Sequence, residues 1–174
     1  MLTISHVSKT FAPGTANEHL ALDDISLHLA PGEFVTVIGS NGAGKSTLMN
    51  AVSGSFIVDK GRITLGGQDI TFVIEHKRAR IVGRLFQDPM KGTAPHMTLE
   101  ENLALAYSRG KRRRFRRAVN AKDIAVFREA LARFGMGLED RMKTKVGLLS
   151  GGQRQAVTLL MCTIVPPRVL LLDE

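Results

Sequence analysis

The fold of this chain is decided by one stretch, Gly39-Ser40-Asn41-Gly42-Ala43-Gly44-Lys45-Ser46. It fits the phosphate-loop pattern at every fixed position. The glycines let the backbone curl so that its N–H groups point at phosphate oxygens, and the following helix adds the partial positive charge of its N-terminus. We therefore predict a site for a nucleotide phosphate chain, in which Lys45 bridges the β- and γ-phosphates and Ser46 binds Mg²⁺.

The residues around the loop have the strand–loop–helix order that such a loop requires. The short β-branched run Phe34–Ile38 predicts a buried strand before it, and a helix is expected to begin at Ser46, with Thr47 in its first turn beside the nucleotide. Other apolar patterns predict strands at 2–6, 25–29, 62–65, 81–86 and 169–172.

The middle of the chain has a helical character instead. Thr98 and Glu101 form a capping-box pattern that predicts a helix to Ala106 or Tyr107. Apolar residues at helical spacing predict a second helix over 124–134, ended by Gly135. Ser150 is expected to cap a third helix that runs toward Ile164.

Two acidic residues follow the last apolar strand. Asp173 stands where a carboxylate can hold Mg²⁺, and Glu174 can activate the attacking water as a general base. An apolar strand that ends in acids is a weak signal alone, but downstream of a phosphate loop it predicts a hydrolytic site.

A second anion cradle is predicted at Leu149-Ser150-Gly151-Gly152-Gln153, where a Ser and two glycines stand at a helix N-terminus. A single phosphate site has no use for two cradles. A composite site between two chains needs both, because each chain then offers its phosphate loop to one ATP and its second cradle to the ATP of the partner.

With these motifs together, the chain resembles the nucleotide-binding subunits of the ATP-binding cassette (ABC) family. Leu149–Gln153 matches the signature motif, Gly39–Ser46 the Walker A motif, and Val169–Asp173 the Walker B motif. The resemblance implies that Glu174 is the catalytic acid. It also implies that Gln87, in the Q-loop Leu85–Asp88, contacts Mg²⁺ and the attacking water, and that Phe11 stacks on adenine.

The resemblance implies an α/β fold: a P-loop NTPase core with an N-terminal antiparallel β-subdomain and a helical insert. One ATP-binding domain is expected over 1–174, divided into a β-subdomain with the phosphate-loop core (1–87), a helical subdomain (88–150), and the signature helix with the Walker B strand (151–174). Because family members usually continue past Walker B, we expect a C-terminally incomplete domain, which binds nucleotide poorly in isolation and hydrolyses it negligibly.

The charge of the chain is concentrated in one place. Its net charge is +8, and 111–117 carries six of the positive charges, so the basicity is a local run and not a spread nucleic-acid footprint. A solvated loop and a segment near anionic lipid head groups both fit this run. No apolar run is long enough to span a bilayer, and Cys162 is expected to be a small core residue.

The predicted function is ATP binding and hydrolysis that powers an importer, from the cytoplasmic face of the membrane. The expected partners are transmembrane permease subunits, a second copy of the chain and, indirectly, a solute-binding protein of the tryptophan type; no nucleic acid is expected. The alternatives are a cytosolic ABC-type translation or repair ATPase, which the basic run favours, and a non-catalytic fragment. The interval from Lys45 to Ser150 leaves no room for the long coiled coils of chromosome-repair ATPases.

Overall fold

The computed structural model describes residues 1–88, 90–109 and 119–173. The chain divides into two compact units, Met1–Val82 and Gly83–Glu174, and each is described by itself. The predicted Glu174 and the basic run 111–117 lie outside the described residues. The predicted three-part division of the domain stays a prediction.

The first unit contains an antiparallel sheet in the order β2-β1-β3-β4. Its strands are β1 (Leu2–Phe11), β2 (His19–Leu29), β3 (Lys60–Leu65) and β4 (Gln68–Asp69). Central strand β1 places Leu2 between Leu29 of β2 and Leu65 of β3. The residues that alternate along β1 and β3, Leu2, Ile4, Ile63 and Leu65, are all buried, so the strands predicted from alternation at 2–6, 25–29 and 62–65 are confirmed.

Strand β1 is irregular between Ile4 and Lys9, where its register against both neighbours shifts. Opposite this segment lies Gly61 of β3, with a φ of +86°. A Cβ atom at Gly61 would overlap the carbonyl oxygen of His6, so any larger residue would push the strands apart. Glycine here is required by the close approach of two backbones.

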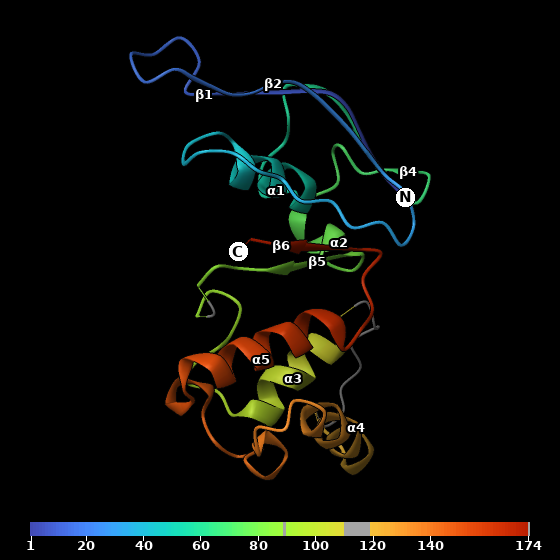
Figure 1. Cartoon of the computed structure of the whole chain (residues 1–174), viewed down its shortest axis with the longest axis vertical. Helices are drawn as coiled ribbons and strands as arrows, with labels where there is room; N and C mark the ends of the chain where they lie inside the picture. Colours follow the sequence, from blue (N-terminus) through green and yellow to red (C-terminus); the bar gives the residue numbers. More distant parts are fainter. Residues whose placement is uncertain (89, 110–118, 174) are drawn as a thin grey trace. The chain divides into compact units, whose positions relative to one another are not determined.

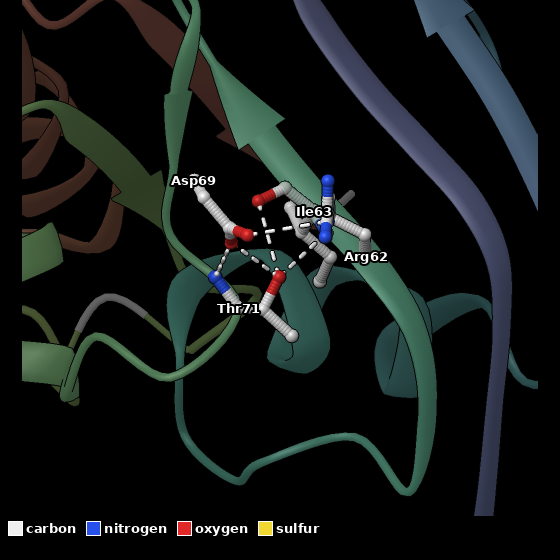
Figure 2. A network of polar contacts seen from close by, with 4 residues as sticks. All are labelled: Arg62, Ile63, Asp69 and Thr71. Atoms are coloured by element: carbon white, nitrogen blue, oxygen red, sulfur yellow. Dashed lines mark hydrogen bonds and ion pairs between the residues drawn. The ribbon is translucent and has the colours of Figure 1, made fainter.

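The β3–β4 hairpin is closed by a polar network, which Figure 2 shows. The hydroxyl of Thr71 accepts a hydrogen bond from the amide of Ile63 (2.9 Å) and donates one to the carboxylate of Asp69 (2.6 Å). The amide of Thr71 also donates to Asp69 (2.9 Å), and Arg62 Nε lies 3.2 Å from the other carboxylate oxygen. These hydrogen bonds, with the nearby arginine, hold the pKa of Asp69 below its ordinary value.

Two helices complete the first unit, α1 (Lys45–Ser53) and α2 (Glu75–Arg78). Arg78 is only 1% exposed, and its guanidinium donates to the carbonyls of Ala51 and Val52 at the end of α1 and to those of Thr71 and Val73. Because helix C-termini leave carbonyl groups without intrahelical partners, Arg78 acts as the cap that joins α1 to the chain after the hairpin.

The predicted buried strand at Phe34–Ile38 is wrong. This segment is not in a strand, and the side chains of Phe34 and Ile38 are 81% and 90% exposed. A strand exists only through ladder hydrogen bonds with a neighbour, and none of the described strands pairs with this run. A β-branched run indicates side chains that fit well on a sheet, but it forms a strand only where a neighbouring strand is available, and no described strand pairs with it here.

In the second unit, strand β5 (Val82–Leu85), which begins at the last residue of the first unit, pairs with β6 (Val169–Leu172). Helices α3 (Leu99–Tyr107), α4 (Ala121–Ala132) and α5 (Gly151–Thr163) pack on one another, as Figure 1 shows in yellow, brown and orange. Two short 3₁₀ helices, η1 (Leu138–Asp140) and η2 (Val146–Leu148), lie between α4 and α5. Leu103, Phe127, Leu131 and Val157 form the centre of their shared core.

The helix starts predicted from capping patterns are confirmed. Thr98 with Glu101 and Ser150 with Gln153 each form a reciprocal capping box, at the start of α3 and of α5. Helix α4 ends at Ala132, before the predicted stop at Gly135. Cys162 is buried, as expected. Among the described residues, no helix has the length and apolar character needed to cross a bilayer.

Candidate nucleotide-binding site

The phosphate loop lies in the first unit, directly before α1. Gly42 and Gly44 have φ values of +83° and +84°, the left-handed conformation that glycine adopts without strain. A Cβ atom at Gly44 would lie 2.8 Å from the carbonyl oxygen of Ala21 in β2, so this glycine also lets the loop approach the sheet. The backbone thus has the curled form that the sequence pattern predicts.

Lys45 folds back over the loop. Its Nζ donates to the carbonyls of Gly39 (2.7 Å) and Ser40 (2.9 Å), and the amide of Ala43 donates to the carbonyl of Ser40 (3.2 Å). The ammonium group is therefore held at the loop and not directed away from it. From this position it can exchange a carbonyl for a phosphate oxygen, which is a stronger acceptor because it is charged.

The start of α1 differs from the starts of the three long helices in the second unit. Helices α3, α4 and α5 are each capped by a side chain, from Thr98, Asn120 and Ser150. The N-cap residue of α1 is Gly44, which has no side chain, and the first turn of the helix contains no acidic residue. The N-terminus of α1 thus has no side-chain cap and no acid in its first turn, two features that favour the binding of phosphate at helix amides.

Phe11 stands at the end of β1 and is 38% exposed. Its ring meets that of Phe56 edge to face, with centroids 5.2 Å apart, and Lys9 Nζ lies 5.6 Å from each centroid. Lys9 is fixed by Asp59, 2.7 Å away, and this hydrogen bond helps to lower the pKa of the Asp59 carboxyl. The partly exposed Phe11 is thus held on a rigid support, as a residue that stacks on a base must be.

The predicted metal and water ligands of the second unit lie at the ends of its paired strands. Gln87 follows β5 and is exposed, and Asp173 follows β6. The amide of Asp173 donates to the carbonyl of Leu85 (3.2 Å), which ties the end of one strand to the other. The carboxylate of Asp173 lies 3.4 Å from Arg84 Nη2.

The signature residues Leu149–Gln153 turn from η2 into α5. The hydroxyl of Ser150 accepts from the amide of Gln153 (3.3 Å), and Gln153 Oε1 accepts from the amide of Ser150 (3.2 Å). A Cβ atom at Gly151 or Gly152 would meet no described atom within 4 Å beyond the neighbouring backbone of its own helix, and neither residue has a positive φ. Nothing in the described part of the chain therefore demands glycine at these two exposed positions, which favours a requirement from outside the chain.

Four residues that the sequence reasoning missed support these predicted sites. Phe56 and Lys9 contact Phe11, and Arg84 contacts Asp173. Arg141 Nη1 donates to Gln153 Oε1 (3.3 Å) from the segment after η1. Of these four, only Arg84 could have been found from the sequence, since a charged residue within the predicted apolar strand 81–86 requires a partner.

The predicted donors suit Mg²⁺ in their chemistry, because Ser46, Gln87 and Asp173 all offer oxygen atoms, which this ion prefers. No cluster of three His, Cys, Asp or Glu side chains able to hold a metal exists among the residues that the structure describes. Mg²⁺ is usually held by one or two carboxylates together with substrate phosphates and water, and a donor set with the single carboxylate of Asp173 fits that chemistry.

The fold and the loop define a nucleotide-binding domain of the phosphate-loop class. The family model described as "ABC transporter" matches residues 22–174. A tyrosine transport ATP-binding protein of Clostridioides difficile is 42% identical over 174 residues, which are 100% of this chain and 69% of the relative. The chain therefore belongs to the ABC transporter family, as the motifs predicted.

Other curated relatives are longer. A spermidine/putrescine import ATP-binding protein of Protochlamydia amoebophila is 33% identical over 99% of this chain and 42% of its own length. A sulfate/thiosulfate import ATP-binding protein of Xanthomonas campestris is 39% identical, over 99% of this chain and 47% of its own length. The chain thus spans less than half of these two proteins.

The solved structures agree on the fold. A dimeric structure of a bacterial ABC transporter cassette has a TM-score of 0.84 at 25% identity, covering 100% of this chain and 74% of that one. A dimeric post-hydrolysis state of an ATP-binding cassette, bound to ADP and phosphate, has a TM-score of 0.83 at 24% identity, with the same coverage. The predicted fold class, an α/β ABC ATPase domain, is confirmed.

Proposed function

We propose that this chain is the ATP-binding and ATP-hydrolysing part of an ABC importer. The observation that carries the proposal is the start of α1, where two left-handed glycines and Lys45 surround helix amides that no side chain caps. The names of the relatives, which describe tyrosine, spermidine/putrescine and sulfate/thiosulfate import or transport, support the coupling to import.

In the proposed mechanism, the motif residues divide the work of binding the nucleotide and activating water. The amides of 39–47 and Lys45 bind the phosphates, while Phe11 stacks on adenine. Asp173, Ser46 and Gln87 would hold Mg²⁺, which supplies positive charge to the phosphate oxygens. Gln87 orients the attacking water and Glu174 accepts its proton.

The signature residues Leu149–Gln153 are proposed to act on the ATP of a second copy of the chain. The open space around Gly151 and Gly152 supports this part, because a phosphate can approach their backbone closely. The dimeric state of the two solved cassettes is consistent with it. ATP then joins two chains, hydrolysis separates them, and this motion is passed to transmembrane permease subunits at the cytoplasmic face of the membrane.

The phosphate-loop assignment is tested with Lys45→Ala in the full-length protein. Removing a charged donor from a phosphate is expected to weaken Mg-ATP binding by about 10- to 100-fold. Equilibrium binding of a fluorescent ATP analogue measures this, and Lys77→Ala, at an exposed residue of α2, is the matched control. Normal ATP affinity in Lys45→Ala would sink the assignment.

The signature assignment is tested with Gly151→Ala. Since the new methyl group meets nothing in its own chain, the melting temperature is expected to stay within about 2 °C of the unchanged protein. ATP-driven dimerisation, followed by analytical ultracentrifugation in a Glu174→Gln background, is expected to be lost. Dimerisation that survives in the Gly151→Ala variant would contradict a role for the signature in the partner's site.

The salt dependence of nucleic-acid binding distinguishes the proposed importer subunit from the alternative, an ABC-type ATPase that acts on nucleic acid. Binding of RNA or DNA that falls steeply between 50 and 200 mM salt, as phosphate contacts require, would favour that alternative. We expect only weak binding, because the one dense run of basic residues, at 111–117, is short and local.

A further inference from the structure

Arg84 is a partly buried charge that the proposed function leaves without a role. It lies on β5, two positions after Val82, and its side chain is 13% exposed. Burying a guanidinium group is costly unless it is paired, so its contacts indicate what retains it there. One contact of opposite charge is the carboxylate of Asp173, 3.4 Å from Arg84 Nη2.

The position of Arg84 is restrained from three directions. Its guanidinium lies over the ring of Phe86, with its Cζ 4.6 Å from the centroid. The thiol of Cys162, on α5, donates to the carbonyl oxygen of Arg84 (2.8 Å). The pairing of β5 with β6 includes the bond from the amide of Asp173 to the carbonyl of Leu85. A flat guanidinium stacked on an aromatic ring has little freedom to turn, so its charge is held at one place.

Asp173 carries the carboxylate assigned to the metal, and its backbone amide is hydrogen-bonded to the carbonyl of Leu85. Its side chain is 24% exposed, so part of it is open to solvent, and Arg84 Nη2 lies 3.4 Å from Oδ2 of the carboxylate. A fixed positive charge at this distance does two things. It orients the carboxylate before any metal arrives, and it lowers the negative potential that attracts a divalent cation.

We propose that Arg84 is a positioning residue that holds the Asp173 carboxylate and weakens its attraction for divalent cations. The proposal rests on the proposed function, because it concerns the metal that accompanies ATP. If the proposal holds, the positive charge of Arg84 partly offsets the negative charge of the Asp173 carboxylate when no nucleotide is bound. Tight metal binding then requires the phosphates of the nucleotide as additional ligands.

The first experiment measures metal binding and not turnover. Binding of Mn²⁺ to the full-length protein with a non-hydrolysable ATP analogue is followed by electron paramagnetic resonance of the free ion. Arg84→Met is expected to lower the half-saturating Mn²⁺ concentration by roughly 3- to 10-fold, since a positive charge near the cation is removed. Arg84→Lys keeps the charge and is expected to stay within about twofold of the unchanged protein.

Arg168→Met is the matched control, because it removes the same charge from an exposed residue directly before β6. It is expected to change the Mn²⁺ midpoint by less than about twofold, since exposed charges are screened. A midpoint in Arg84→Met that is unchanged or raised overturns the proposal. An equal effect from Arg168→Met also overturns it, because the effect would then belong to net charge alone.

A second experiment needs no nucleotide and separates this proposal from the proposed function. Urea unfolding of Arg84→Met, Asp173→Asn and the double variant, without metal, forms a double-mutant cycle. The midpoint shift of the double variant is expected to be smaller than the sum of the single shifts. Additive shifts overturn the proposal even where ATP binds as expected. If the protein binds no metal–nucleotide complex, the proposed function fails and the cycle still decides the Arg84–Asp173 coupling.

Discussion

Single residues of this chain have roles that depend on contacts far away in the sequence. Arg78 is an example, because its guanidinium caps the end of α1, which lies more than twenty positions earlier. Burial lowers the pKa of Arg78, and the nearby Asp69 opposes this effect, yet arginine remains protonated in proteins. The charged donor is thus permanently available to four carbonyl oxygens.

Arg78→Met is expected to destabilise the protein by about 3 kcal/mol or more, because it leaves buried carbonyl groups at the end of α1 without donors. Chemical unfolding monitored by circular dichroism measures the change. Arg80→Met is the matched control at an exposed neighbour, and it should stay within about 0.5 kcal/mol. Equal effects of the two variants would contradict the capping role of Arg78.

At the scale of elements, the β3–β4 hairpin joins sequence-local turn chemistry to a tertiary network. The strand at 62–65 was predicted from the sequence, and β3 ends at Leu65 as expected. The role of Thr71 was not visible, because its hydroxyl contacts Ile63 only once the hairpin has formed. The lowered pKa of Asp69 is a consequence of the same network.

The Asp69 carboxylate of the hairpin is expected to make the free energy of unfolding depend on pH. The pKa of Asp69 is lowered by folding, so its stabilising contribution is complete above the unfolded value near pH 4 and is lost as the pH falls through the folded value. Asp69→Asn should therefore unfold at a lower urea concentration than the unchanged protein at pH 7, with a gap that closes toward pH 2.5.

Asp23→Asn, at an exposed position of β2, is the control for this experiment. It should change the free energy of unfolding by no more than about 0.5 kcal/mol at pH 7. A gap between Asp69→Asn and the unchanged protein that stays constant from pH 7 to pH 2.5 would show that the ionised carboxylate is not what stabilises the hairpin.

At the scale of the whole molecule, each compact unit has its own buried residues. Leu2, Ile4, Ile63 and Leu65 are buried in the first unit, while the second unit is centred on the helical cluster around Phe127. Tyr107 meets Phe127 edge to face, with centroids 5.5 Å apart. Separate cores predict that damage to one unit is felt first within that unit.

Phe127→Ala is expected to cost about 3–5 kcal/mol, because it leaves a cavity at a fully buried position. Hydrogen exchange should rise in α3, α4 and α5 and stay near its original level in β1 and β3. Val126→Ala, on the neighbouring and largely exposed residue of α4, should leave both units unchanged. A uniform rise over the two units after Phe127→Ala would mean that they unfold as one cooperative body.

The sequence by itself determined the family, the phosphate loop, the helix starts at Thr98 and Ser150 and most of the strands. Each of these depends on local chemistry: glycine conformation, capping hydrogen bonds or apolar period. Only the tertiary structure decided that Phe34–Ile38 forms no strand, that Arg78 caps α1, that Phe56 and Lys9 support Phe11, and that Arg84 faces Asp173. The physical reason is that ladder pairing, capping across the fold and ion pairing require a second partner, whose place in space is set by the folded chain and not by spacing along it.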